Sequence, residues 1–217
     1  MQQDALSTAV DSALAQCRLL SHPFYVRWTQ GEVTMDELQR YAAQYRHFEA
    51  AVPSVLQSVA DSARTDGIRT QARAILADET GGPATHLELF DRFSRALDAP
   101  SSAPSPAMQR LLDTYRECAD SGDVAGLSAV LAYETQSAAI AATKADGLRA
   151  HGLVSDDVAL AFWDVHARVD NEHTEWALQA LADAVEEPAP VTAPARAAAQ
   201  AWWAFLDERE AQRFGTA

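Results

Sequence analysis

The sequence has few cysteines, few basic residues and no long apolar run. Its two cysteines, Cys17 and Cys118, are far apart and form no C-x-x-C pair, which argues against a disulfide framework or a thiolate metal site. Lys and Arg total 17 against 31 Asp and Glu, so the formal net charge is −14. This charge opposes binding to nucleic acid and to anionic membranes, and we expect neither as a partner.

The start of the chain also lacks the features of a signal peptide. Asp4 and Asp11 occur where such a peptide needs a basic start and an apolar stretch, and no run of 18 apolar residues follows. Together with the scarcity of cysteine, this predicts a cytoplasmic protein without a membrane segment.

No segment shows the alternation of a β-strand, whereas apolar residues recur at helical spacing almost throughout. The predicted fold class is therefore all-α, in one domain that buries roughly 70% of the surface of the unfolded chain. A Pro-rich linker at 188–194 is expected to separate the main unit, 1–187, from a C-terminal segment, 195–217, that packs on the bundle or on a second subunit. We expect helices at 4–20, 35–62, 68–80, 84–98, 107–120, 123–150, 155–187 and 194–213.

The most informative segment is WDVHARVDNEHTEWAL, residues 163–178. On a helix, His166, Asp170 and His173 fall within about 60° of one another. Apolar residues flank them, so these side chains project from a stripe that would otherwise pack in the core. Burying them is costly unless a partner satisfies them, and a divalent iron, manganese or zinc ion would do so.

Three further polar residues occupy inward positions on other predicted helices. Glu134 lies on the apolar stripe of 123–150, Glu79 follows Ile75 and Leu76 at helical spacing, and His86 begins the stripe after the Gly81-Gly82-Pro83 break. Alone, an inward His is usually a core residue and an inward Glu usually pairs with Arg. Six such residues without a matching number of Lys or Arg favour a metal site.

The number and order of these residues indicate which kind of metal site they form. A zinc hydrolase needs three ligands, and a structural zinc site normally uses Cys, so six nitrogen and oxygen ligands point to two metals. Ferritin-like diiron bundles use two E-x-x-H motifs, and this sequence contains none.

The spacing Glu79-x6-His86, Glu134 and His166-x3-Asp170-x2-His173 resembles that of the haem-oxygenase-like diiron oxidases. Within them, residues 22–53, which begin with the motif His-Pro-Phe-Tyr, resemble the branch named for the chlamydia protein associating with death domains. The resemblance covers about residues 10–185. It implies a bundle of about seven to eight helices like those of the TenA and PqqC proteins, and a domain, 1–187, that holds two iron ions or a manganese–iron pair.

Members of that branch are para-aminobenzoate synthases that use one of their own tyrosines as the ring source and an internal lysine as the nitrogen source. The resemblance assigns these roles to Tyr25 and Lys144. It also implies dioxygen and an external electron donor as partners, no external organic substrate, and a homodimer.

The residues themselves leave other roles open for these side chains. Tyr25, in an irregular segment after Pro23, can simply anchor the N-terminal helix. Lys144 lies about 80° around the helix from Glu134, at the rim of the stripe, where it can extend to solvent. Tyr41 and Tyr133 can relay electrons or pack.

The alternative function within the class is oxidation of an external small substrate by desaturation, decarboxylation or N-oxygenation. A TenA-like hydrolase needs a nucleophilic core cysteine, and neither cysteine sits in a matching motif. A non-enzymatic interaction protein leaves six inward ligands unexplained.

Overall fold

Residues 1–154 and 156–213 are described by the structure, a computed structural model, with the side chains of 169–172 outside the description. Within these residues the chain forms nine α-helices and no strand, which confirms the predicted all-α class. No described helix has the length and apolar character needed to cross a membrane. The helices are α1 (Gln3–Leu14), α2 (Pro23–Gln30), α3 (Met35–Ser62), α4 (Asp66–Thr80), α5 (His86–Ala96), α6 (Pro106–Ser121), α7 (Asp123–Ala150), α8 (Asp157–Ala184) and α9 (Ala189–Ala211).

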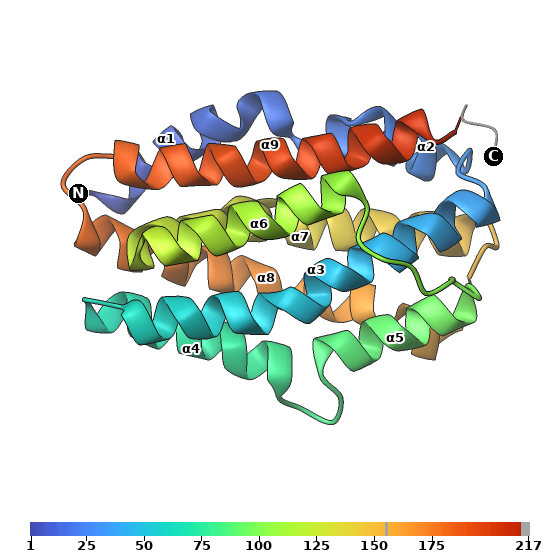
Figure 1. Cartoon of the computed structure of the whole chain (residues 1–217), viewed down its shortest axis with the longest axis horizontal. Helices are drawn as coiled ribbons and strands as arrows, with labels where there is room; N and C mark the ends of the chain where they lie inside the picture. The colour runs from blue at the N-terminus through green and yellow to red at the C-terminus, as the bar shows by residue number, and fades with distance from the viewer. Residues whose placement is uncertain (155, 214–217) are drawn as a thin grey trace.

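The long helices run side by side along the long axis of the molecule (Figure 1). Helix α7 packs against α6, α8 and α9, and α3 packs against α4, α5 and α6. Small residues allow this close packing. A Cβ atom added at Gly126 of α7 would lie 2.4 Å from Cγ2 of Val59 on α3, so only glycine fits there without a shift in the neighbouring helix.

Helix α2 occupies the segment that was predicted to be irregular. That prediction was wrong because Pro23 starts the helix instead of breaking it: proline suits the first helical position, where its missing N–H would have no partner in the helix. The ring of His22 caps the helix, with Nδ1 accepting a hydrogen bond of 3.1 Å from the backbone N–H of Phe24. At the other end Gly31 adopts a left-handed conformation, φ 72°.

Side chains hold α2 firmly against the bundle. Arg27 Nη2 donates to Glu37 Oε1 at 2.6 Å and to Glu210 Oε2 at 2.9 Å, which ties α2 to α3 and α9. Trp28 Nε1 donates to the backbone carbonyl of Lys144 at 3.3 Å. The short helix is therefore fixed beside the C-terminal part of α7.

Two predicted boundaries differ from the structure. The helix expected at 4–20 ends at Leu14 and continues as two short 3-10 turns, Ala15–Cys17 and Leu19–Ser21. The linker expected at 188–194 is helical from Ala189, because Pro190 lies in the first turn of α9, where a backbone N–H is not needed. The aromatic side chains of α9, among them the fully buried Trp202, pack into the bundle.

Candidate metal centre

Three predicted ligands from three helices converge in the core. Glu79 lies in the last turn of α4, His86 is the first residue of α5, and His166 lies in the middle of α8. Each offers one ligand atom, and these atoms lie within 4.8 Å of one another. Glu79 Oε1 is 3.1 Å from His86 Nδ1. This is the spacing that one metal ion between the three side chains requires.

The turn between α4 and α5 brings two of these side chains together. Gly82 adopts φ 75°, which glycine tolerates without strain. Thr85 then caps α5 in a capping box with Glu88. After this short loop α5 continues in the direction of α4 (Figure 1), and both helices pack against α8, so the last turn of α4 and the first turn of α5 meet beside α8.

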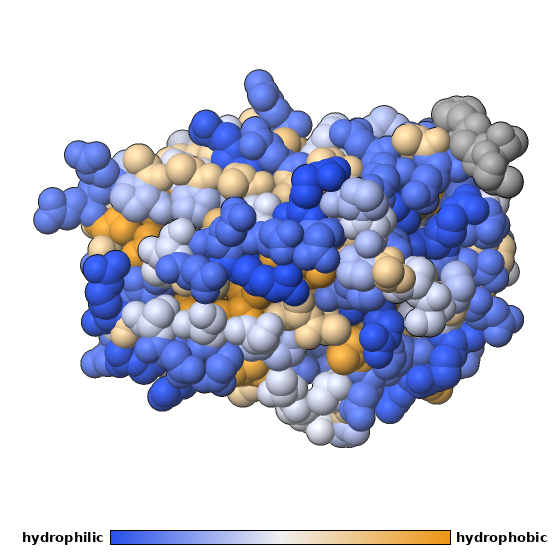
Figure 2. Space-filling view, viewed as in Figure 1, coloured by the Kyte–Doolittle hydropathy of each residue, from blue (hydrophilic) through white to orange (hydrophobic). Residues whose placement is uncertain are grey.

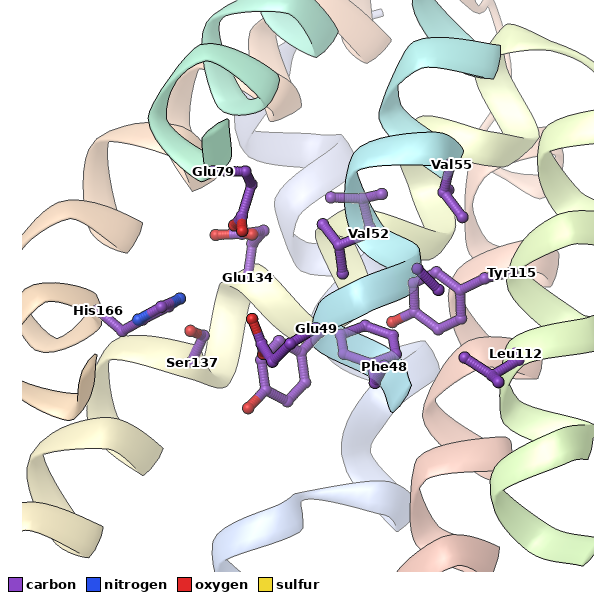
Figure 3. Close-up of a pocket in the computed structure, with 13 residues that line it drawn as sticks. Phe48, Glu49, Val52, Val55, Glu79, Leu112, Tyr115, Glu134, Ser137 and His166 are labelled. Atoms are coloured by element: carbon purple, nitrogen blue, oxygen red, sulfur yellow. The ribbon is translucent and has the colours of Figure 1, made fainter. Parts of the chain in front are cut away.

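Glu134 and His173 lie next to this group. Glu134, on α7, points toward Glu79 (Figure 3), and its Oε2 is 3.8 Å from His173 Nδ1. The sixth predicted ligand, Asp170, belongs to the side chains outside the described residues, and no position is assigned to it.

Buried polar atoms in this group lack hydrogen bonds. They are Glu79 Oε2, Glu134 Oε2 and His86 Nδ1, and in the described part of the chain neither carboxylate forms an ion pair with Lys or Arg. Unsatisfied buried groups of this kind are rare in proteins and costly. Imidazole and carboxylate donors suit iron or manganese, so the residues present fit a metal ion.

The protonation state of His166 is also suited to metal binding. Burial, aided by the neighbouring His86, lowers the pKa of His166 to about 4, so its ring is neutral near pH 7. Its Nδ1–H donates to the backbone carbonyl of Phe162 at 2.9 Å, which leaves the Nε2 lone pair free to bind a metal. Burial also raises the pKa of the Glu134 carboxyl.

Asp78 orients one of the candidate ligands, His173, and the sequence pattern did not predict this role. Its Oδ2 accepts a hydrogen bond of 2.7 Å from His173 Nε2, which turns the lone pair of Nδ1 toward Glu134. A carboxylate behind a ligating histidine fixes the tautomer and orientation of the ring. Asp78 is about half exposed, so no inward pattern in the sequence could reveal it.

A second polar cluster lies between α2, α3 and α7. Lys144 Nζ donates to the Tyr41 hydroxyl at 2.6 Å, and the hydroxyls of Tyr25 and Tyr41 are 3.0 Å apart. The prediction of a rim lysine was wrong, since Lys144 is only 1% exposed. Helix α2 covers this side of α7, because Gly147 lets Trp28 approach to a distance that a Cβ atom would obstruct.

The lysine amine is enclosed by aromatic rings. Its Nζ lies 4.9 Å from the centre of the Tyr25 ring and 4.2 Å from that of Trp163. Burial lowers the pKa of Lys144 well below its usual range, which favours the neutral amine, the nucleophilic form.

Tyrosines connect this cluster to the candidate ligands. The Tyr41 and Tyr45 rings stack with centres 5.4 Å apart, and the hydroxyls of Tyr45 and Tyr133 are 2.6 Å apart. Tyr133 precedes Glu134 in the chain. A continuous series of phenols thus leads from Tyr25 to the edge of the metal centre.

A cavity of about 30 Å³ lies beside the ligands (Figure 3). Glu79, Glu134 and His166 line one side, together with Glu49 and Ser137. The sequence analysis did not identify Glu49, which is 4% exposed. Sites for organic ligands usually measure about 300–1,000 Å³, so this cavity suits a molecule of the size of water or dioxygen.

Comparison with known protein families shows to which family the chain belongs. The family model described as "Iron-containing redox enzyme" matches residues 39–207, a range that includes every candidate ligand. The chain belongs to this family. This iron-containing redox enzyme is therefore an oxidoreductase, as the sequence predicted, and the hydrolase and the non-enzymatic alternatives are set aside.

Individual relatives agree with this assignment. The redox enzyme is 34% identical to a 4-aminobenzoate synthase of Nitrosomonas europaea, with 95% of this chain and 92% of the relative covered. It is 30% identical to a 4-aminobenzoate synthase of Chlamydia muridarum, over 76% of this chain and 72% of the relative.

Solved structures show the same fold. A CADD-like protein of Nostoc punctiforme superposes with a TM-score of 0.81 at 18% identity, over 98% of this chain and 99% of the other. A TenA homologue of Pseudomonas syringae gives 0.80 at 12% identity, over 97% and 96% of the two chains. The redox enzyme thus has the haem-oxygenase-like, TenA-like bundle that was predicted.

Proposed function

We propose that the protein is a 4-aminobenzoate synthase that builds its product from its own Tyr25, with Lys144 as the nitrogen donor. Relatives with this activity in their names, similar over most of the chain, support the product. One observation supports the claim that the ring and the nitrogen come from the protein itself. The buried Lys144 amine lies 4.9 Å from the centre of the Tyr25 ring.

Glu79, His86 and His166 would hold one metal ion, and Glu134, Asp170 and His173 would hold a second. We propose two irons, or manganese with iron, because the donors are imidazole and carboxylate. When bound, the metal pair would supply oxidation by dioxygen, with electrons from an external donor. The described ligands Glu79, His86, His166 and His173 are buried, and Asp78 orients His173.

The carbon atoms and the nitrogen of the product have sources in these two side chains. Tyr25 would provide the benzene ring and its Cβ; the Cα–Cβ bond would break and dioxygen would oxidise Cβ to the carboxylate, whose oxygens come from dioxygen or water. At the para position the Lys144 nitrogen would bond to the ring as its own bond to Cε breaks, and the phenol oxygen would leave as water. Burial lowers the pKa of Lys144 and raises that of Tyr25, so both groups rest in their neutral forms.

Tyr41 and Tyr133 have supporting roles in this proposal. Tyr41 contacts both the Lys144 amine and the Tyr25 hydroxyl, and it would position them. Tyr133 adjoins Glu134 and would pass electrons between the metal centre and Tyr25 through Tyr45. The external-substrate alternative is less favoured, because the cavity beside the ligands measures about 30 Å³.

Isotope labelling tests the internal source. Cells that express the protein and receive ring-labelled tyrosine and amine-labelled lysine should yield 4-aminobenzoate with both labels. The spent chain should lose the mass of the Tyr25 ring with its Cβ and of the Lys144 nitrogen. Tyr25→Phe and Lys144→Met should abolish the product at unchanged metal content. Tyr115→Phe is the matched control. It removes a buried phenol that does not belong to the series of tyrosines from Tyr25 to Tyr133, and this variant should still form the product. Labelled product from the Tyr25→Phe protein would refute the internal source.

The predictions of a homodimer and of a cytoplasmic location belong to this proposal as well. Light scattering coupled to size-exclusion chromatography gives the mass of the assembly, and fractionation of the native host gives the location. A monomer at micromolar concentration would reject the dimer without affecting the chemistry.

A further inference from the structure

The cavity beside the candidate ligands has two chemically different ends. Glu79, Glu134 and His166 form the polar end. Val52, Val55 and Leu112 lie at the opposite end with Tyr115 (Figure 3), and Val130 is also part of the lining. The valine and leucine side chains offer no hydrogen bonds to water, and the Tyr115 hydroxyl already accepts one from Trp202 Nε1 at 3.0 Å. Apolar cavities in proteins stay dry and bind xenon or small apolar molecules.

A surface hollow lies on the outer side of the same wall. It is formed by α3 and α6, and its lining includes Ser54, Ser58 and Arg116. Val55 lines both the hollow and the inner cavity, and its side chain is 4% exposed. Val55 is therefore the residue that the two linings share. Figure 2 shows apolar side chains in the seam between α6 and α3 on this face.

We propose that dioxygen reaches the candidate metal centre through the seam between α3 and α6, with Val55 as the gate and the apolar end of the cavity as its last stop. The inference rests on the proposed function in one respect, the use of dioxygen. A small apolar molecule needs no polar partner to enter this path, whereas ions and organic acids do. The cavity volume of about 30 Å³ admits a diatomic molecule.

Xenon provides a test that needs neither metal nor activity. Crystals of the metal-free protein under xenon pressure should show xenon between Val52, Leu112 and Val130. Val55→Ala should keep this site, and Val55→Phe should reduce its occupancy. Ordered water throughout the apolar end, or xenon bound only elsewhere, would overturn the proposal.

Kinetics test the gate itself. The iron-loaded, chemically reduced protein is mixed with buffers of increasing dioxygen concentration, and the second-order rate constant of its oxidation is measured. Val55→Phe should lower this constant by about tenfold, equivalent to about 1.4 kcal/mol, and Val55→Ala should not lower it. Val59→Ala is the matched control, because Val59 is a buried valine one turn along α3 that contacts Gly126 instead of the cavity.

The outcomes separate this inference from the proposed function. Equal rate constants for the wild type, Val55→Phe and Val59→Ala would refute the gate, and the circular dichroism of each variant verifies its folding. Gated oxidation without formation of 4-aminobenzoate would reject the proposed product and leave the route standing. Labelled 4-aminobenzoate together with equal rate constants of oxidation in all variants would refute the route through Val55 and leave the proposed product standing.

Discussion

Replacement of Lys144 by methionine should make the metal-free protein more stable near neutral pH. Methionine has a similar length, is apolar and fills the aromatic enclosure, whereas the wild-type protein must bury an amine that the unfolded chain would protonate. Lys144 is 1% exposed, and burial lowers its pKa well below the usual value.

The size of the effect follows from how the free energy of unfolding depends on pH. Between the folded pKa of Lys144 and the unfolded value near 10.4, the unfolded state holds one more proton than the folded state. Stability of the wild type therefore rises with pH, at about 1.4 kcal/mol per pH unit from this one group. Lys144→Met lacks this term, so its advantage over the wild type should shrink by that amount for each unit of increasing pH.

Urea denaturation of both metal-free proteins at pH 7, 8 and 9 measures the two free energies of unfolding. A difference between the proteins that stays constant over these pH values would show that Lys144 is charged in the fold. That result would refute the argument that a neutral amine faces Tyr25, whether or not the variant still makes product.

Three further changes test the site. Asp78→Ala should weaken metal binding by about 10–100-fold, because the ring of His173 loses its orienting carboxylate; titration with iron or manganese under anaerobic conditions measures this. Glu134→Gln should stabilise the metal-free protein by about 1 kcal/mol in urea denaturation while lowering metal content, since it removes a buried carboxylate with an unsatisfied oxygen. Gly147→Ala should destabilise the fold by about 1–3 kcal/mol, because the new Cβ would lie 2.9 Å from Trp28; an unchanged urea midpoint would contradict the close packing of α2 on α7.

Much of this architecture could be predicted from the sequence because helical periodicity is local. The inward positions of Glu79, His86, Glu134, His166 and His173 followed from their places on apolar stripes, and the structure brings these five side chains to one region. Their assignment as metal ligands stays a prediction, and Asp170 lies among the side chains outside the description.

Other features depend on contacts that no local pattern contains. Lys144 sits at the edge of the stripe of its own helix, and it is buried because α2 packs over that edge and Trp163 of α8 encloses the amine. Helix α2 was missed because Pro23 was interpreted as a break, although its cap is the ring of the residue before it. Asp78 acts through a bond to a residue 95 positions away, which spacing along one helix cannot reveal.

If Tyr25 is consumed as proposed, its burial has a consequence for the lifetime of the protein. Its ring is 1% exposed and belongs to a helix of eight residues. A chain that has given up this side chain has lost an aromatic ring from its core, and truncations of this size commonly cost about 3–5 kcal/mol. The used protein would unfold more often than the fresh one, and cellular proteases degrade such chains first. Loss of this one side chain would thus lead to the degradation of protein molecules that have already reacted.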